Sequence, residues 1–112
     1  MSRQPESRLS GKIMLALRQR GAWCFKVHGS AAQMSGVPDI LGVWHGVFFG
    51  IETKMPGKEH SRSARQRLVM GDIQRAGGIA FVSSSVAHSL ETLDREFYEA
   101  NEHLPRFNRL EE

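Results

Sequence analysis

The sequence has a single cysteine, Cys24, and no apolar run long enough to cross a membrane. One cysteine excludes an internal disulfide and a zinc site built from several thiolates. The longest apolar runs, VFF and LVM, fall far short of the roughly 20 residues that a membrane-spanning helix needs. The polar start, MSRQPESRLSG, lacks the apolar core of a signal peptide. These absences predict a cytoplasmic protein in which Cys24 is a small buried hydrophobe.

Charge is moderate in amount but uneven along the chain. The 112 residues carry a formal net charge of +3, and 24% of them are charged, which is ordinary for one globular domain. Residues 54–67 read KMPGKEHSRSARQR, and their basic side chains are Lys54, Lys58, Arg62, Arg65 and Arg67, against the single acid Glu59. Such a run is either a solvated surface or a patch that binds phosphate groups.

Hydrophobic periodicity predicts one α/β domain over residues 1–112, with a core at about 5–100 and a polar tail at 101–112. The expected order is αβββαβα. Helices are expected at about 5–20, 62–76 and 86–100, and strands at 23–28, on both arms of a hairpin within 36–54, and at 79–83. The first strand alternates Trp23, Phe25 and Val27 with Cys24, Lys26 and His28, and we expect Trp23 and Trp44 to lie in the core.

The hairpin places two acids in an apolar setting. His45-Gly46 is the natural turn, and a turn there pairs Trp44 with Val47. Continuing this register places Asp39 opposite Glu52, with Cβ atoms roughly 4.5–5.5 Å apart. Lys54 follows two residues after Glu52 and therefore points to the same face. Two opposed carboxylates destabilise a sheet unless something neutralises them. They are either ligands of a divalent cation such as Mg²⁺ or part of a salt-bridged patch with Lys54.

The wider pattern resembles a known nuclease family. Pro38-Asp39 followed by Glu52-Thr53-Lys54 looks like the PD-(D/E)xK nuclease signature. The context comprises Glu6 in an opening helix and the segments GAWCFKVHG, GVPDILG and FFGIETKMPG, then Gln66 eleven residues before Gly77-Gly78. Together these features resemble the VRR-NUC family over about residues 5–90, and the length is similar to its stand-alone members in bacteria and phages.

The resemblance implies roles for individual residues. The implied metal ligands are Asp39, Glu52, the Thr53 carbonyl and Glu6, and the implied catalytic set is Asp39, Glu52, Lys54 and Gln66. Mg²⁺ or Mn²⁺ is the implied cofactor. Independently of the resemblance, the basic run predicts that Lys58, Arg62, Arg65 and Arg67 hold the DNA backbone. Lys26 and His28 would face the site and contact phosphate if their strand pairs with the hairpin, the alternative being a solvated role. The segment KEHSRSAR before Gln66 departs from the Pro- or Thr-containing approach expected of the family, which leaves the start of that helix open.

These features together predict a metal-dependent endonuclease that hydrolyses DNA, with branched DNA such as four-way junctions as the expected substrate. Two alternatives stay open: a non-catalytic nucleic-acid-binding module, and a restriction-type endonuclease of the same fold, for whose base-reading segments 112 residues leave little room. One site cuts one strand at a time, so paired cuts in a junction predict a homodimer. We expect its interface within residues 86–110, where Tyr98, Leu104, Phe107 and Leu110 stand out.

Overall fold

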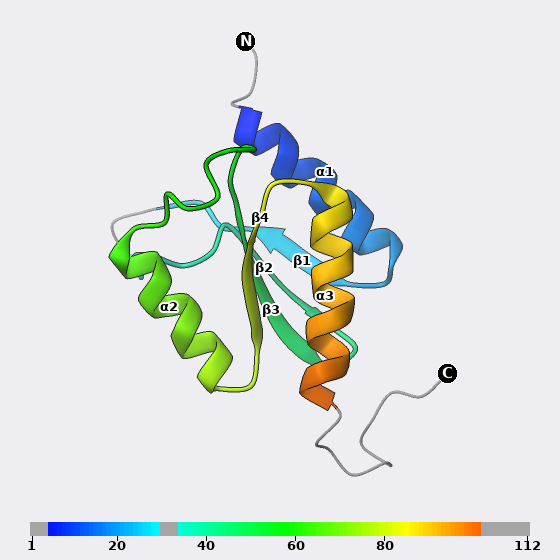
Figure 1. The fold of residues 1–112 in the computed structure, drawn as a ribbon. Coiled ribbons are helices and arrows are strands. Elements are labelled where there is room, and N and C mark those ends of the chain that lie inside the picture. Colours follow the sequence, from blue (N-terminus) through cyan, green and yellow to red (C-terminus); the bar gives the residue numbers. More distant parts are fainter. Residues whose placement is uncertain (1–4, 30–33, 102–112) are drawn as a thin grey trace.

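The computed structural model describes residues 5–29 and 34–101 and has a mixed α/β architecture (Figure 1). The helices are α1 (Pro5–Gln19), α2 (Ala64–Arg75) and α3 (Val86–Asn101), and the strands are β1 (Trp23–Lys26), β2 (Ile40–Trp44), β3 (Val47–Thr53) and β4 (Ile79–Ser83). The expected α/β class is therefore confirmed. Within the described ranges, no helix has the length and apolar character required to span a membrane.

The four strands form one sheet in the order β1-β2-β3-β4. β1 pairs with β2, and β2 with β3, in antiparallel orientation, whereas β3 and β4 are parallel. The sheet is therefore mixed. The β2–β3 hairpin has the predicted register, with Trp44 paired to Val47. Both turn residues adopt the left-handed backbone that tight hairpin turns require, at φ 52° for His45 and 80° for Gly46.

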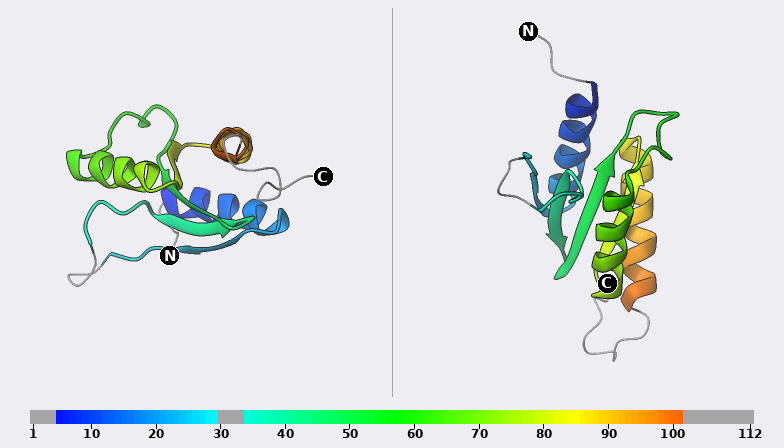
Figure 2. Two further views of the ribbon diagram at one scale, coloured as in Figure 1. Left: turned by 90° about the horizontal axis from the view of Figure 1, so that it is seen from below. Right: turned by 90° about the vertical axis from the view of Figure 1, so that its left-hand side faces the viewer.

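The helices lie on both faces of the sheet (Figure 2). The core cluster joins Ile13 and Leu17 of α1 with Leu93 and Phe97 of α3, and it includes Phe49 on β3. Helices α1 and α3 therefore cover the same face. Helix α2 lies on the opposite face, against β4 and β3, and Figure 1 shows α2 and α3 on either side of β4.

The helix ends follow local capping chemistry. Helix α1 stops before Gly21, which has a φ of +92°. Helix α2 begins at Ala64 rather than near Arg62, because Ser63 is its N-cap and its hydroxyl accepts from the Gln66 N–H. Gly77 lies just after the end of α2 and has a positive φ of +99°. The Ser85 hydroxyl accepts from the His88 N–H at the start of α3, as expected of a capping serine.

The prediction that Trp23 lies in the core is wrong, since its side chain is 64% exposed. On β1 the buried residue is Cys24, which faces α1. Helices α1 and α3 both pack on the Cys24 face, and α2 reaches only β3 and β4, so the other face of β1 stays open. Trp44 is buried as predicted, and its indole N–H donates to the Arg20 carbonyl. Strand β1 ends at Lys26, two residues earlier than expected.

Candidate nuclease site

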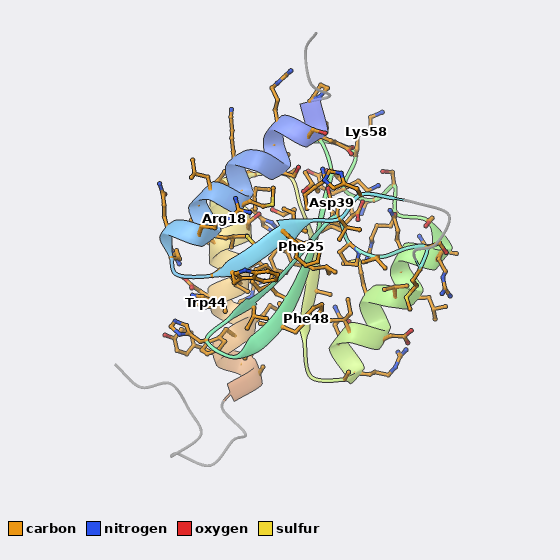
Figure 3. All side chains as sticks on the ribbon, turned by 180° about the vertical axis from the view of Figure 1, so that it is seen from behind. Arg18, Phe25, Asp39, Trp44, Phe48 and Lys58 are labelled. Atoms are coloured by element: carbon orange, nitrogen blue, oxygen red, sulfur yellow. The ribbon has the colours of Figure 1, made fainter. Side chains whose placement is uncertain are left out.

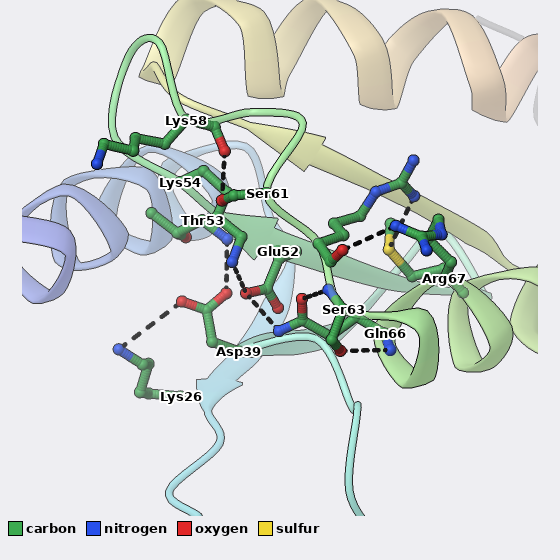
Figure 4. Close-up of polar contacts among 12 residues, drawn as sticks. Lys26, Asp39, Glu52, Thr53, Lys54, Lys58, Ser61, Ser63, Gln66 and Arg67 are labelled. Carbon is green, nitrogen blue, oxygen red and sulfur yellow. Dashed lines mark hydrogen bonds and ion pairs between the residues drawn. The ribbon is translucent and has the colours of Figure 1, made fainter.

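Asp39 and Glu52 meet at one end of the β2–β3 hairpin (Figure 4). Asp39 lies one residue before β2, and its carboxylate Oδ1 accepts from the Thr53 N–H at an N···O distance of 2.8 Å. The buried Pro38 sets this position, since it packs on Gly50, where an added Cβ would lie 2.9 Å from Pro38 Cγ. Asp39 is thus tied to β3 by a hydrogen bond rather than by strand pairing.

Burial perturbs both carboxyl groups, and the charge of Asp39 further perturbs Glu52. Glu52 is only 7% exposed. Its burial, and secondly the charge of Asp39, raise its pKa to about 7, although the nearby Lys54 opposes this shift. Burial also raises the pKa of Asp39, against the lowering effects of the Thr53 N–H and of Lys26. The hydrogen bond from the Thr53 N–H holds Asp39 beside the residue that follows Glu52 on β3.

Lys54 and Gln66 both reach Glu52 through the same oxygen, Oε2. The Lys54 ammonium lies 3.5 Å from it, and the Gln66 side-chain amide donates to it at 3.2 Å. The other end of the Gln66 amide is held as well, because its Oε1 accepts from the Ser63 N–H at 2.9 Å. The N-terminal cap of α2 thus fixes the amide that contacts Glu52.

Lys26 approaches Asp39 from β1. Its ammonium lies 3.9 Å from Asp39 Oδ2 and donates to the Ser10 hydroxyl of α1 at 3.1 Å. Lys26 therefore belongs to the polar cluster, and its predicted phosphate contact stays a prediction. His28 lies beyond the end of β1 and is exposed, and its predicted phosphate contact stays a prediction.

The Thr53 carbonyl faces the Asp39 side of β3. The Ser83 carbonyl accepts from the Lys54 N–H, so Lys54 directs its N–H towards β4. Strand residues alternate in this respect, and the Thr53 N–H accordingly points away from β4, to Asp39. The C=O of a strand residue points to the same side as its N–H, so the Thr53 carbonyl also points away from β4, and its predicted role as a metal ligand stays a prediction.

Glu6 lies apart from the two acids. It sits in the first turn of α1 and lines a hollow that it shares with Lys26 and Met55. Over residues 5–29 and 34–101, no three His, Cys, Asp or Glu side chains are grouped closely enough to hold a metal ion together. The predicted contact of Glu6 with a metal therefore stays a prediction.

The basic residues after β3 divide into anchored and free side chains. Arg62 contacts the sulfur of Met70, and Arg67 donates to the Arg62 carbonyl at 2.8 Å. Arg65 donates to the Ser35 carbonyl and packs so closely on Gly36 that an added Cβ there would lie 2.6 Å from Arg65 Cγ. Lys58 is exposed, and its ammonium has no hydrogen-bond or ion-pair partner in the part of the chain that the structure describes.

Two supporting residues were not predicted as part of the site. Ser63 and Gln66 have the S-x-x-Q spacing of a capping box, a pattern that could have located both the start of α2 and the orientation of Gln66. Ser10 is buried on α1 and accepts from Lys26. No local pattern links Ser10 to a lysine sixteen residues later, since only the packing of α1 on β1 brings them together.

Comparison with known proteins does not identify a family for this chain. No model of a known protein family matches the chain. A search of curated proteins likewise finds no relative. The contacts of the site residues are therefore the basis for the proposed function.

Ionised Glu52 should destabilise the metal-free protein. A carboxyl group whose pKa is higher in the folded state contributes stability that is fully present below its unfolded pKa of about 4.3 and is lost as pH rises through about 7. Glu52→Gln removes this loss. In the presence of a chelator, we expect the variant to match the wild type near pH 4 and to exceed its unfolding free energy by about 3–4 kcal/mol at pH 8.

Urea unfolding at the two pH values measures this difference. Glu91→Gln, which removes an exposed glutamate from α3, is the matched control. An equal effect of Glu52→Gln at both pH values would show that burial does not perturb this carboxyl group.

Proposed function

We propose that this protein is a metal-dependent endonuclease that hydrolyses phosphodiester bonds in DNA. The observation that carries the proposal is the convergence on one buried carboxylate: Glu52 Oε2 is contacted by both Lys54 and Gln66, with Asp39 alongside. A purely structural salt bridge would not need a second acid that raises the pKa of the first. Two carboxylates, a lysine and an amide in one cluster are suited to metal-assisted hydrolysis.

The donor set fits a hard divalent cation. Asp39, Glu52 and the Thr53 carbonyl offer oxygen atoms, which Mg²⁺ and Mn²⁺ prefer, and Mg²⁺ commonly binds through one or two carboxylates plus water and phosphate. A cation would also offset the burial of both carboxylates and the repulsion by Asp39 that raises the pKa of Glu52. When bound, it would lower the pKa of a water molecule and offset charge on the scissile phosphate.

The protein's own residues would then have distinct roles. Lys54 would hold the attacking water or stabilise the charge that develops on the phosphate. Gln66 would keep Glu52 oriented, because its amide is fixed at both ends. Lys26 would compensate the charge of Asp39 and offer a second cation to a bound phosphate.

The proposal also covers the preferred DNA substrate and the fold family. The resemblance to VRR-NUC proteins supports a PD-(D/E)xK fold, a homodimer and branched DNA as substrate. Basic residues around α2, with Lys58 free to reach a phosphate, would hold the backbone and give affinity without reading sequence.

The proposed function is tested by incubating purified protein and Mg²⁺ with linear, flapped and four-way-junction DNA that share one sequence. We expect cleavage near the branch point and slower cleavage of the linear duplex. Equal cleavage of all three would remove the preference for branched DNA, and intact DNA in every case would overturn the proposed function.

Lys58→Ala should weaken DNA binding without affecting the fold, because the side chain is exposed and its ammonium forms no hydrogen bond or ion pair with residues 5–29 or 34–101. The loss of one phosphate contact should reduce the slope of log affinity against log salt by about one. Fluorescence anisotropy over a salt series measures this slope. Arg75→Ala, an exposed residue at the far end of α2 that pairs with Asp72, is the control and should leave the slope unchanged. If both variants changed it equally, Lys58 would not be a specific contact.

A further inference from the structure

On the sheet face that carries α2, the part formed by β1, β2 and the start of β3 is apolar and exposed. Trp23, Val43 and Phe48 are in register across β1, β2 and β3, so their side chains form a row on one side. Their exposed fractions are 64%, 40% and 42%. Phe25, at 42%, continues the surface next to Trp23, with the two rings 5.5 Å apart. Figure 3 shows Phe25 and Phe48 on the strands, with α2 to one side.

This surface extends towards α2. The strand residues that form it are uncharged. The positions on this side of β1, β2 and β3 are Trp23, Phe25, Leu41, Val43, Phe48 and Gly50, and the first charged one is the buried Glu52. Beside Phe48, a groove of about 400 Å³ is lined by Met34 and by Val69 and Ile73 of α2, with Asp72 as its one charged lining residue. The row and this groove together are named the open face.

The open face has the size of an interface core. With roughly 200 Å² for a fully exposed aromatic side chain, the exposed parts of Trp23, Phe25 and Phe48 amount to about 300 Å². Val43 and Met34 add further apolar area. Apolar patches of about 300–600 Å² are the largest that monomers usually show and are often functional. A standard interface buries roughly 800 Å² on each partner, with an apolar core and a polar rim.

We propose that the open face binds a second copy of this chain, so that two sheets pack face to face about a two-fold axis. A flat, uncharged row is self-complementary, as a two-fold interface requires. A nucleic-acid surface would combine its aromatic residues with cations, and the strand positions of this face have none. The interface thus differs from the one expected on α3, whose inward residues Val86, Leu90, Leu93 and Phe97 are used in the core. Leu104, Phe107 and Leu110 lie outside the described residues.

Self-association can be measured without reference to activity. Sedimentation equilibrium of the wild type at micromolar concentrations should give twice the monomer mass of 12.6 kDa. Of the two tryptophans, Trp44 is already buried, so a blue shift of emission on association would report the burial of Trp23. A single species at monomer mass throughout would overturn the proposal.

Val43→Glu places a charge in the middle of the row and should convert the dimer to a monomer. The matched controls are Leu15→Glu on α1 and Tyr98→Glu on α3, both exposed apolar residues outside the open face. Both should remain dimeric. Far-UV circular dichroism checks that Val43→Glu is folded, and Phe48→Glu provides a second test if it is not. Dissociation by Tyr98→Glu, with Val43→Glu and Phe48→Glu still dimeric, would move the interface to α3 and overturn the proposal.

Cleavage then separates this proposal from the proposed function. If the chain is a nuclease, folded monomeric Val43→Glu should still nick DNA but lose paired cuts in both strands of a junction. If the wild type is dimeric but cleaves no DNA, the interface stands and the nuclease proposal fails. If Trp23 emission responds to DNA but not to protein concentration, the open face binds nucleic acid and the dimer proposal fails.

Discussion

Lys54→Ala should lower the rate of DNA cleavage by about 100- to 1,000-fold, the loss typical when one charge-stabilising donor is removed from an active site. The ammonium lies 3.5 Å from Glu52 Oε2 and is the basic group nearest to that carboxylate among the contacts that the structure describes. DNA binding should stay close to wild type, because phosphate contacts outside the site supply most of the affinity. Single-turnover cleavage and anisotropy on the same DNA separate the two effects.

Lys12→Ala, which removes an exposed lysine from α1, is the control and should cleave at the wild-type rate. Lys54→Ala removes a cation from beside a buried carboxylate, so its thermal unfolding should be measured alongside. Cleavage by folded Lys54→Ala at the wild-type rate would exclude a catalytic role for this lysine. Loss of both cleavage and binding would instead assign Lys54 to DNA affinity.

Asp39→Asn should reduce cleavage at least about 100-fold, since it removes one of the two charged metal donors. The substitution preserves shape, and the asparagine oxygen can still accept from the Thr53 N–H. The fold should therefore be retained, and the same variant should weaken Mn²⁺ binding measured by calorimetry. Asp94→Asn changes an exposed partner of Arg20 and is the matched control. Wild-type cleavage by Asp39→Asn would remove Asp39 from the metal site.

The sequence predicts the hairpin well because its determinants are local. His45-Gly46 tolerates the positive φ values of a tight turn, and the turn then sets the pairing of Trp44 with Val47. The same register brings Asp39 near Glu52, and the period of two brings Lys54 to the same carboxylate. The site role of Gln66 is implied by the resemblance, and its amide contacts Glu52.

The faces of β1 could not be predicted in the same way. Its alternation separates Trp23 and Phe25 from Cys24 and Lys26, but it does not say which side the helices cover. Large aromatic residues are ordinarily the buried choice, yet here α1 packs over Cys24 and Lys26. That outcome depends on how α1 and α3 dock on the sheet, which is a property of tertiary packing.

The place of Glu6 illustrates the same limit at the site. Helical periodicity puts it on the stripe of Leu9 and Ile13, which pack on the core, but a first-turn residue can lie beyond the edge of the sheet. Glu6 is exposed and faces the hollow beside Lys26. Sequence spacing predicts on which side of a helix a residue lies. It does not predict how far the end of that helix lies from a neighbouring strand.

The central claim is that Asp39 and Glu52 hold a divalent cation that DNA hydrolysis requires. It is tested most directly by following cleavage of branched DNA by the wild type in EDTA, and then after excess Mg²⁺ or Mn²⁺ is added to the same sample. We predict intact DNA in EDTA and full cleavage once the cation is restored. Undiminished cleavage in EDTA would contradict the claim.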